Sequence, residues 1–303
     1  MEIRMSLLGK NNSRRLLSKA DIKLLFGRIT QNTLSLLPRL ALNPKAAILY
    51  ARVAAAFAKK DYSAVYSLKH AMFCSLFGIE YDRFEIVAGI GEGESTMVFG
   101  FDDLQVCNVI IDNQYDISEW NMKGKTVLDA GANTGVFSIF AAKLGAKKVY
   151  AFEPILENIE CIRKNALANG VAECIVPVPM AIGDKKLETE IEYSGSGDPS
   201  ASLVLTHPHS GSLKRQKITI TTIDDFAKEQ GIKIDFIKMD IEGYEKEAML
   251  GGKTTLSTHK PALSFSAYHK PNDKVELPQT LHSIRPDYSC RLLRRAEEVF
   301  CCD

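Results

Sequence analysis

Residues 126–137 read Thr-Val-Leu-Asp-Ala-Gly-Ala-Asn-Thr-Gly-Val-Phe, and this stretch decides the fold. A short apolar strand ends in the acid Asp129, a loop of small residues follows, and apolar residues then recur at helical spacing. A second strand, at residues 149–152, ends in Glu153. One β-loop-α-β unit with a carboxylate at the tip of each strand is typical of folds that bind an adenosine-bearing cofactor at the carboxyl ends of their strands.

The loop distinguishes between two such cofactors. Gly131 and Gly135 let the backbone turn sharply, and Glu153, 22 residues after Gly131, can accept hydrogen bonds from a ribose. The dinucleotide fingerprint G-x-G-x-x-G fails because Asn133 stands where its second glycine belongs. Asp129 would also repel a pyrophosphate about 4 Å away by roughly 4 kcal/mol at an effective dielectric constant near 20. S-adenosylmethionine carries an ammonium and a sulfonium instead, so the loop favours it over a nicotinamide dinucleotide.

Composition indicates an ordinary globular protein. Of 303 residues, 46% are hydrophobic and 25% are charged, which is enough apolar material for a large core. The net charge of +1 argues against a nucleic-acid-binding protein, although residues 1–60 carry 12 Lys/Arg against two acids. Basic amphipathic helices there could make peripheral contact with an anionic membrane or an acidic partner; a solvated face is the simpler interpretation.

The sequence shows no transmembrane segment and no export signal. The longest apolar run, residues 46–58, is interrupted by Arg52 and is too short to cross a bilayer. The seven cysteines have no Cys-x-x-Cys spacing and no framework of pairs, so we expect reduced thiols in a cytoplasmic protein. Metal binding by Cys301 and Cys302 stays open, without a nearby His or Cys to support it.

Two regions are predicted along the chain. Residues 1–80 are expected to form a helical N-terminal extension, and residues 81–303 the cofactor-binding domain. The expected helices of the extension cover residues 13–28, 43–60 and 61–78. Residues 81–112 read as strands, with a hairpin turn at the glycine-rich residues 89–93 because no apolar-periodic helix follows them.

From Thr126 onward, strands alternate with helices. The strands are centred near residues 127, 150, 177, 219, 237, 264, 290 and 299. The helices cover roughly residues 134–144, 155–169, 223–230, 243–250 and 273–284. This alternation predicts an α/β fold with a doubly wound, mostly parallel sheet and helices on both faces. Residues 194–212, rich in Ser, Gly and Pro, read as an inserted loop and a candidate lid near the acceptor.

These motifs resemble those of the FkbM-type family of S-adenosylmethionine-dependent methyltransferases. The matching segments are residues 124–135, 151–154 with Asn158, 181–184, 235–245 and 268–271, in the family's order. The resemblance implies the seven-stranded, Rossmann-like sheet of class I methyltransferases, S-adenosyl-L-methionine as cofactor, and mostly O-methylation. The expected acceptor is a sugar, a glycan or another hydroxyl-bearing small molecule. Residues 289–296 depart from the family because they lack its Arg-His-Tyr run.

The resemblance also implies which residues bind the cofactor. Asp129 would orient the glycine loop and face the cofactor's ammonium, and Glu153 would bind the ribose. The other cofactor-binding residues expected by motif position are Gly131, Ala132, Asn133, Gly135, Pro154, Asn158, Ala181, Ile182 and Asp240.

Asp240 and His269 are the expected catalytic residues. Asp240 follows the strand at 236–239 and faces the methyl donor by topology, although it could instead cap the next helix. His269 ends a strand on the same edge of the sheet, and a near-neutral imidazole could remove the hydroxyl proton, or the ring could be purely structural. Glu242 could bind the acceptor or a divalent cation, or could face solvent.

Two other functions remain open at this point. A nicotinamide-dependent oxidoreductase would use the same strand ends. A catalytically degenerate methyltransferase fold could serve as a binding module, with the basic N-terminal helices as its docking surface. The leading hypothesis is a methyltransferase.

Overall fold

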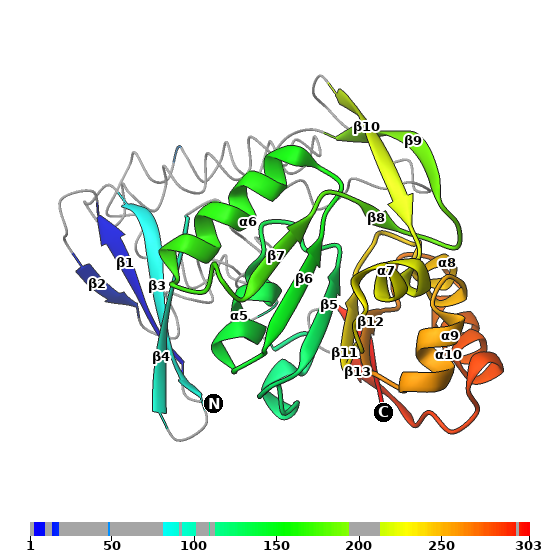
Figure 1. Ribbon diagram of the computed structural model, residues 1–303. Coiled ribbons are helices and arrows are strands. Elements are labelled where there is room, and N and C mark those ends of the chain that lie inside the picture. The colour runs from blue at the N-terminus through cyan, green and yellow to red at the C-terminus, as the bar shows by residue number, and fades with distance from the viewer. Residues whose placement is uncertain are drawn as a thin grey trace. The chain divides into compact units, whose positions relative to one another are not determined.

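The three-dimensional structure is a computed structural model. It describes residues 113–193, 213–294 and 297–303, together with Ile48, Val109 and the strands at residues 3–9, 14–17, 81–90 and 93–100. The chain forms two compact units, one of residues 1–104 with 208–212 and one of residues 105–207 with 213–303 (Figure 1). The division falls after Leu104, whereas we expected it after residue 80.

The first unit contains a four-stranded antiparallel sheet. Its strands are β1 (Ile3–Gly9), β2 (Arg14–Leu17), β3 (Tyr81–Ile90) and β4 (Gly93–Gly100), in the spatial order β2-β1-β3-β4. Ile90 pairs with Gly93, which confirms the hairpin expected at residues 89–93. Because β1 pairs with β3, the hairpin belongs to the first unit, and the boundary therefore lies later than expected.

The expectation of a helical segment over residues 1–80 is wrong for β1 and β2. Ile3 pairs with Ala88, far along the chain, and Met5 pairs with Leu17. Pairing with a distant strand outweighs the local helical spacing of the leucines, because strand propensity depends strongly on such partners. The helices expected between residues 18 and 80 lie outside the described residues, apart from Ile48, which is helical.

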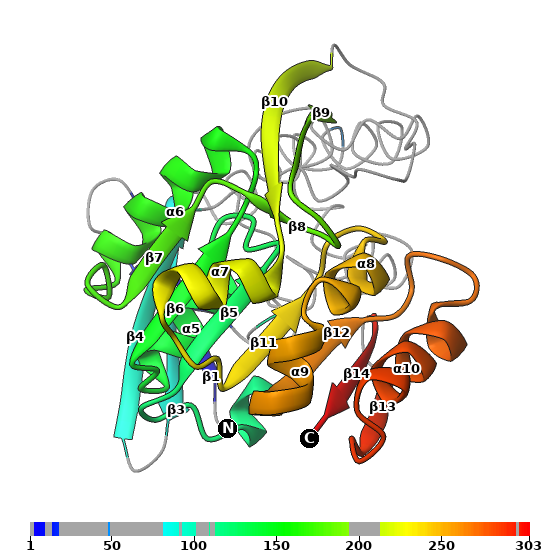
Figure 2. The same cartoon turned by 45° about the vertical axis from the view of Figure 1, so that its right-hand side comes forward.

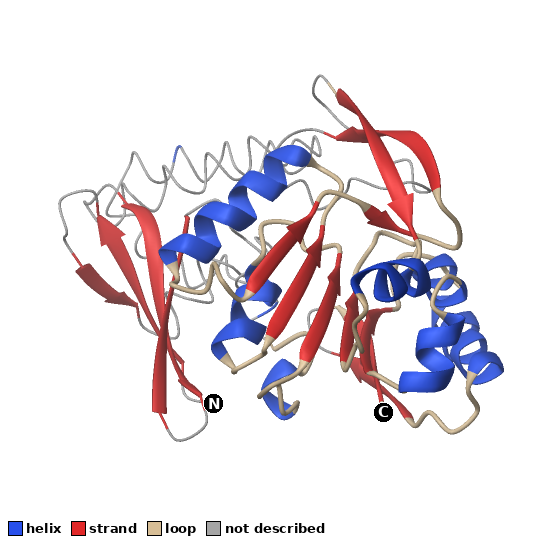
Figure 3. Ribbon diagram, viewed as in Figure 1, coloured by secondary structure: helices blue, strands red, loops and turns tan. Residues whose placement is uncertain are grey.

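The second unit is built on a seven-stranded sheet (Figure 3). Its strands are β5 (Thr126–Ala130), β6 (Lys148–Phe152), β7 (Ile175–Val178), β11 (Phe236–Met239), β12 (Ala262–Ser266), β13 (Cys290–Arg294) and β14 (Glu298–Cys302). The spatial order is β13-β14-β12-β11-β5-β6-β7, and only β14 runs antiparallel to its neighbours. This order confirms the mostly parallel, doubly wound sheet that we expected.

Helices cover both faces of this sheet. Their bounds are α5 (Val136–Lys143), α6 (Leu156–Ala168), α7 (Ile223–Gln230), α8 (Glu245–Leu250), α9 (Lys253–His259) and α10 (Asp273–Ile284). Leu128 and Ala130 of β5 pack in a core shared with α7 to α10, which lie together in Figure 2. Asp129, on the opposite face, contacts Ser138 of α5. Within the described residues, no helix is both long and apolar enough to cross a bilayer.

A small second sheet joins β8 (Ala181–Ile182), β9 (Leu187–Tyr193) and β10 (Lys214–Thr221) in the order β8-β10-β9. The sequence analysis placed β10 in the main parallel series; it pairs instead with β9 in antiparallel orientation. Neither β8, β9 nor the short helix α9 was expected, although β9 alternates exposed and buried residues as a one-sided strand does. The inserted loop at residues 194–212 lies outside the described residues.

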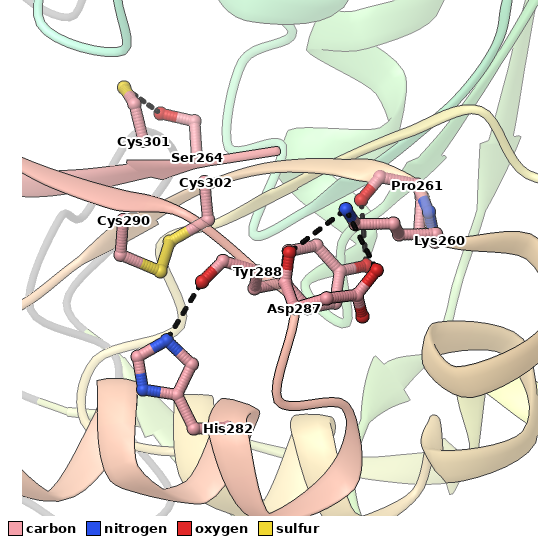
Figure 4. Close-up of a disulfide and its surroundings, with 9 residues drawn as sticks. All are labelled: Lys260, Pro261, Ser264, His282, Asp287, Tyr288, Cys290, Cys301 and Cys302. Carbon is pink, nitrogen blue, oxygen red and sulfur yellow. Dashed lines mark hydrogen bonds and ion pairs between the residues drawn. A yellow bond between two sulfur atoms is a disulfide. The ribbon is translucent and has the colours of Figure 1, made fainter.

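A disulfide joins Cys290 to Cys302 across β13 and β14 (Figure 4). The two cysteines lie directly opposite each other in the strand pair, with Cα atoms 4.2 Å apart. Just before β13, the Tyr288 hydroxyl donates a hydrogen bond to Pro261 O. The expectation of reduced thiols is therefore wrong for this pair, because the strand register that brings them together is not visible in their spacing. The cytoplasmic location, which drew on that expectation, stays a prediction.

The disulfide predicts a redox-dependent stability. Closing a loop of this length in the unfolded chain stabilises the native state by about 3 kcal/mol. We expect Cys290→Ser to lower the free energy of unfolding by about that amount, as measured by urea unfolding without reductant. Dithiothreitol should lower the free energy of unfolding of the wild type by the same amount and leave that of the variant unchanged. Equal stability of wild type and variant under oxidising conditions would contradict the pairing.

Candidate functional site

A cavity opens in the second unit at the carboxyl ends of β5, β6 and β11. It encloses about 880 Å³ of space, a volume that includes its opening to solvent. The predicted cofactor residues that line it are Gly131, Ala132, Asn133, Glu153, Pro154, Ala181, Ile182 and Asp240. Residues predicted from four separate motifs therefore meet in one cavity.

The backbone at Gly131 lies directly against the end of β11. Gly131 has φ +76°, and a Cβ built on it would lie 1.9 Å from the carbonyl oxygen of Asp240. The loop is fixed further because the backbone amides of Gly131 and Ala132 both donate to Phe152 O, at 3.0 and 2.9 Å. Glycine is thus required here by space as well as by conformation. Gly135, in contrast, begins α5 and packs near Ile162 without lining the cavity.

Asp129 does not face the cavity, contrary to expectation. β5 extends to Ala130, so Asp129 lies inside the strand, fully buried, opposite Lys238 of β11. Its carboxylate lies 3.1 Å from Lys238 Nζ and accepts a hydrogen bond of 2.7 Å from Ser138. Lys238 Nζ also donates to Gly131 O at 2.7 Å. Asp129 therefore orients the glycine loop through Lys238. The ion pair with Lys238 balances its negative charge, so Asp129 is not available to a ligand in the cavity.

Glu153 lies at the end of β6 and lines the cavity. Its carboxylate accepts hydrogen bonds from the backbone amides of Asn133 (2.9 Å) and Ile155 (3.0 Å) and from Asn158 Nδ2 (3.2 Å). Burial raises the pKa of Glu153 to about 7, although these hydrogen bonds lower it in part. Three donors leave acceptor capacity for a ligand hydroxyl. Asn158 is buried and does not line the cavity, so it supports the Glu153 carboxylate by its hydrogen bond from the protein interior.

Asp240 projects into the same cavity from the end of β11. The hydroxyl of Tyr115 donates to it at 2.5 Å and that of Tyr268 at 3.3 Å. Burial alone would raise its pKa, but Lys238, His269 and the Tyr115 hydrogen bond outweigh burial and hold the pKa below its usual value. Asp240 does not cap a helix, because α8 begins at Glu245 after the cap residue Tyr244. It is an ionised carboxylate at the cavity wall.

His269 does not fit the role of general base. Its side chain is 3% exposed and does not line the cavity. Burial would lower its pKa, but the carboxylates of Glu242, Glu245 and Asp240 raise the pKa to about 11. A ring with that pKa holds its proton at neutral pH and cannot accept another. Glu242 lines the cavity, and burial raises its pKa to about 7, so the solvent-facing alternative for Glu242 is wrong.

Two of the cavity residues that were missed from the sequence, Lys238 and Tyr115, contact the acids near the ends of the strands. Lys238 carried a usable signal, because a lysine inside the apolar strand Phe236–Met239 must find a buried partner. Tyr115 carried none: it precedes the first strand of the sheet, yet its hydroxyl meets Asp240, 125 residues later. Its ring also lies 5.2 Å from Lys238 Nζ, so it contacts both charged groups on β11 and its following loop.

The sheet and its cavity define a Rossmann-like protein of the class I methyltransferase type. Residues 129–289, more than half of the chain, match the family model described as the methyltransferase FkbM domain, and the chain belongs to this family.

Individual relatives share shorter segments. The chain is 47% identical over 64 residues to ribosomal protein arginine N-methyltransferase rmt3 of Schizosaccharomyces pombe, which is 21% of this chain and 12% of that protein. It is 33% identical over 97 residues to ribosomal protein L11 methyltransferase of Aeromonas hydrophila subsp. hydrophila, 31% of this chain and 33% of that protein. The chain thus spans a third or less of these curated relatives. A crystal structure of methyltransferase FkbM from Methylobacillus flagellatus KT aligns with 22% identity and a TM-score of 0.44, over 66% of this chain and 53% of that one.

The contact between Gly131 and Asp240 predicts a steep cost for any side chain. We expect Gly131→Ala to lower the free energy of unfolding by about 3 kcal/mol or more, because a left-handed backbone and a clash with backbone oxygen add together. Gly124→Ala is the matched control: its φ is +73°, but its Cβ would meet no atom within 4 Å, so about 1–2 kcal/mol is expected. Urea unfolding of both variants measures the difference, and equal losses would contradict the close approach.

Proposed function

We propose that this methyltransferase uses S-adenosyl-L-methionine to methylate a hydroxyl group of a sugar or another small molecule. One observation supports it above the others: Glu153, Gly131 and Asp240, from the ends of three neighbouring strands, line a single cavity. A nucleoside with a cationic side chain needs these features together, namely an acceptor for ribose hydroxyls, a close backbone and a negative charge.

The chemistry of the residues that line the cavity supports this cofactor. Glu153 accepts a ribose hydroxyl, and the apolar side chains of Ala181 and Ile182 flank the adenine. Asp240 takes the electrostatic role that we expected of Asp129, because it is the ionised carboxylate that faces the cavity next to the glycine loop. The same charge disfavours a pyrophosphate, so a nicotinamide dinucleotide is the poorer fit.

The acceptor lies on the side of the cavity beyond Asp240. Tyr115, which donates to Asp240, and Glu242 line the cavity and offer hydrogen bonds suited to hydroxyl groups. The acceptor oxygen forms a bond to the methyl carbon, the sulfur–carbon bond breaks, and its electron pair returns to sulfur. The hydroxyl proton leaves to water in the open cavity. The enzyme contributes chiefly by holding the two reactants in line.

Removing the ribose contact should weaken cofactor binding. Glu153→Ala should raise the Kd for S-adenosylhomocysteine by about 10- to 100-fold, since a hydrogen bond to a charged group contributes about 1.5–3 kcal/mol. Isothermal titration calorimetry measures this, with the exposed Glu160→Ala as control. NADH should give no saturable heat. Wild-type protein that fails to bind the nucleoside would end the proposal.

The raised pKa of Glu153 predicts a pH-dependent affinity. Ribose hydroxyls donate to the ionised carboxylate, so below pH 7 the protein must release a proton in order to bind. Affinity for S-adenosylhomocysteine should therefore rise toward pH 7, by up to about tenfold per pH unit, and level off above it. Titrations at pH 6, 7 and 8 test this. Glu153→Gln, which stays neutral, should show a flat profile; a profile equal to that of the wild type would assign the titration to another group.

The nature of the acceptor needs a separate experiment. Methyl-labelled cofactor can be offered with host small-molecule and glycan fractions, and in parallel with arginine-containing peptides. We expect label on hydroxyl-bearing compounds. Label on peptide nitrogen would show that the reaction is N-methylation and would contradict the proposed O-methylation. Tight cofactor binding with no turnover on any fraction would favour the binding-module alternative.

A further inference from the structure

We propose that Asp240, Glu242 and His269 together bind a divalent metal ion at the wall of the cavity. His269 Nε2 lies 3.4 Å from Asp240 Oδ1 and 3.6 Å from Glu242 Oε2. One donor atom from each residue lies within 4.8 Å of the other two. Two donors about 2.1 Å from one ion are themselves about 3.0–3.4 Å apart at octahedral or tetrahedral angles, so the two distances from His269 Nε2 are close to those that a shared ion requires.

The imidazole of His269 points to the same conclusion independently. Its side chain is 3% exposed, and among the described residues neither ring nitrogen makes a hydrogen bond of acceptable geometry. A buried polar group without a hydrogen bond is costly, and such a group commonly marks a site for a missing ion or water. Nε2 is directed at the two carboxylates that line the cavity.

The other ring nitrogen lies close to the kind of partner that a metal-bound histidine uses, and a small rotation of the ring would let it donate. Nδ1 lies 3.1 Å from Glu245 Oε1, and Glu245 is 1% exposed and accepts the backbone amide of Ile241 at 2.9 Å. Histidines that bind metals with one nitrogen generally donate the other N–H to a carboxylate, which sets the tautomer and the ring orientation. Glu245 is therefore a positioning residue, and Nε2 is left for the ion.

Charge balance also favours an ion. The carboxylates of Asp240 and Glu242 are 14% and 21% exposed, so their charges are only partly hydrated. A divalent cation beside these carboxylates would offset their negative charge, and buried charges are tolerated when they are balanced or bind metals.

A second set of potential ligands is less suitable. Glu245, His269 and Asp273 also place donor atoms within 4.8 Å of one another. However, Glu245 Oε1 already accepts the Ile241 amide, and Asp273 Oδ2 accepts the Lys270 amide at 2.7 Å. Neither Glu245 nor Asp273 lines the cavity, so an ion there would have no open path to a substrate. The geometry assigns the ion to the Nε2 side.

The donor set indicates the kind of ion and its role. One imidazole with two carboxylates suits Mn²⁺ or a similar transition-metal ion better than Mg²⁺ or Ca²⁺, which prefer oxygen ligands alone. Its free coordination positions would face the cavity. On the proposed function, which this role rests on, an acceptor hydroxyl bound there would lose its proton to water more readily, since metal coordination lowers its pKa. The ion would thus supply the activation that His269 cannot.

Metal binding can be tested without turnover. The full chain, stripped with EDTA, is titrated with Mn²⁺ while electron paramagnetic resonance reports free Mn²⁺. We expect one ion per chain and an affinity at least tenfold lower in Glu242→Gln and His269→Gln. Pulsed measurements should show nitrogen coupling in the wild type that His269→Gln lacks. Glu276→Gln, a glutamate on α10 paired with Lys246, is the control and should bind as the wild type does.

Several results would overturn the site. These are an absence of stoichiometric Mn²⁺ binding, unchanged affinity in Glu242→Gln, or an absence of nitrogen coupling in the wild type. Glu242 lies at the cavity wall, so Glu242→Gln carries the test if His269→Gln fails to fold. S-adenosylhomocysteine titrated into the same samples separates the two proposals. If the protein binds the nucleoside but not Mn²⁺, the metal site alone is overturned. If it binds Mn²⁺ but not the nucleoside, the proposed function alone is overturned.

Discussion

The buried ammonium of Lys238 is the contact on which the site depends. It lies 3.1 Å from Asp129 and donates to Gly131 O, so it ties β11 to the glycine loop that follows β5. A buried ion pair seldom adds much net stability, because desolvation offsets the attraction, but removing one partner leaves an uncompensated charge. The pair therefore selects one arrangement of the loop. In that arrangement Gly131 lies against Asp240, and the ion pair of Asp129 with Lys238 thereby fixes the shape of the cavity wall.

Local sequence predicted the elements that form around this contact and the cavity edge that they share. The period of apolar residues after Thr126 identified the main strands and helices, since each is short and buried on a regular pattern. Glu153 was placed correctly at the cavity because a carboxylate at a strand end has few structural uses. Asp129 was misplaced by a single residue of strand length: β5 runs to Ala130, and in a strand each residue of extension reverses the face to which a side chain points.

Features that depend on distant partners could not be predicted in this way. β1 is a strand because of β3, and Cys290 meets Cys302 because β13 and β14 share a register. The protonation state of His269 also depends on residues from other segments. Its position at a strand end suggested a neutral base, but its protonation depends on three acids contributed by the loop and helix after β11. Fold is encoded largely in local periodicity, whereas the ionisation of a site is a property of residues brought together from several segments.

The acids around the cavity show how one sheet edge can serve two reactants. Burial raises the pKa of Glu153 to about 7, although its hydrogen bonds and the charge of Lys238 lower it in part. Lys238 and His269 hold the pKa of Asp240 below its usual value, so on the proposed function Asp240 offers a negative charge to a cationic methyl donor. Glu242 lies beside the same ring nitrogen of His269 as Asp240 does. β6 carries the first acid, and β11 with its following loop carries the others. On the proposed function, this strand order separates the residue that binds the ribose from the acids nearest the methyl group, so that the two parts of the reaction depend on different strands.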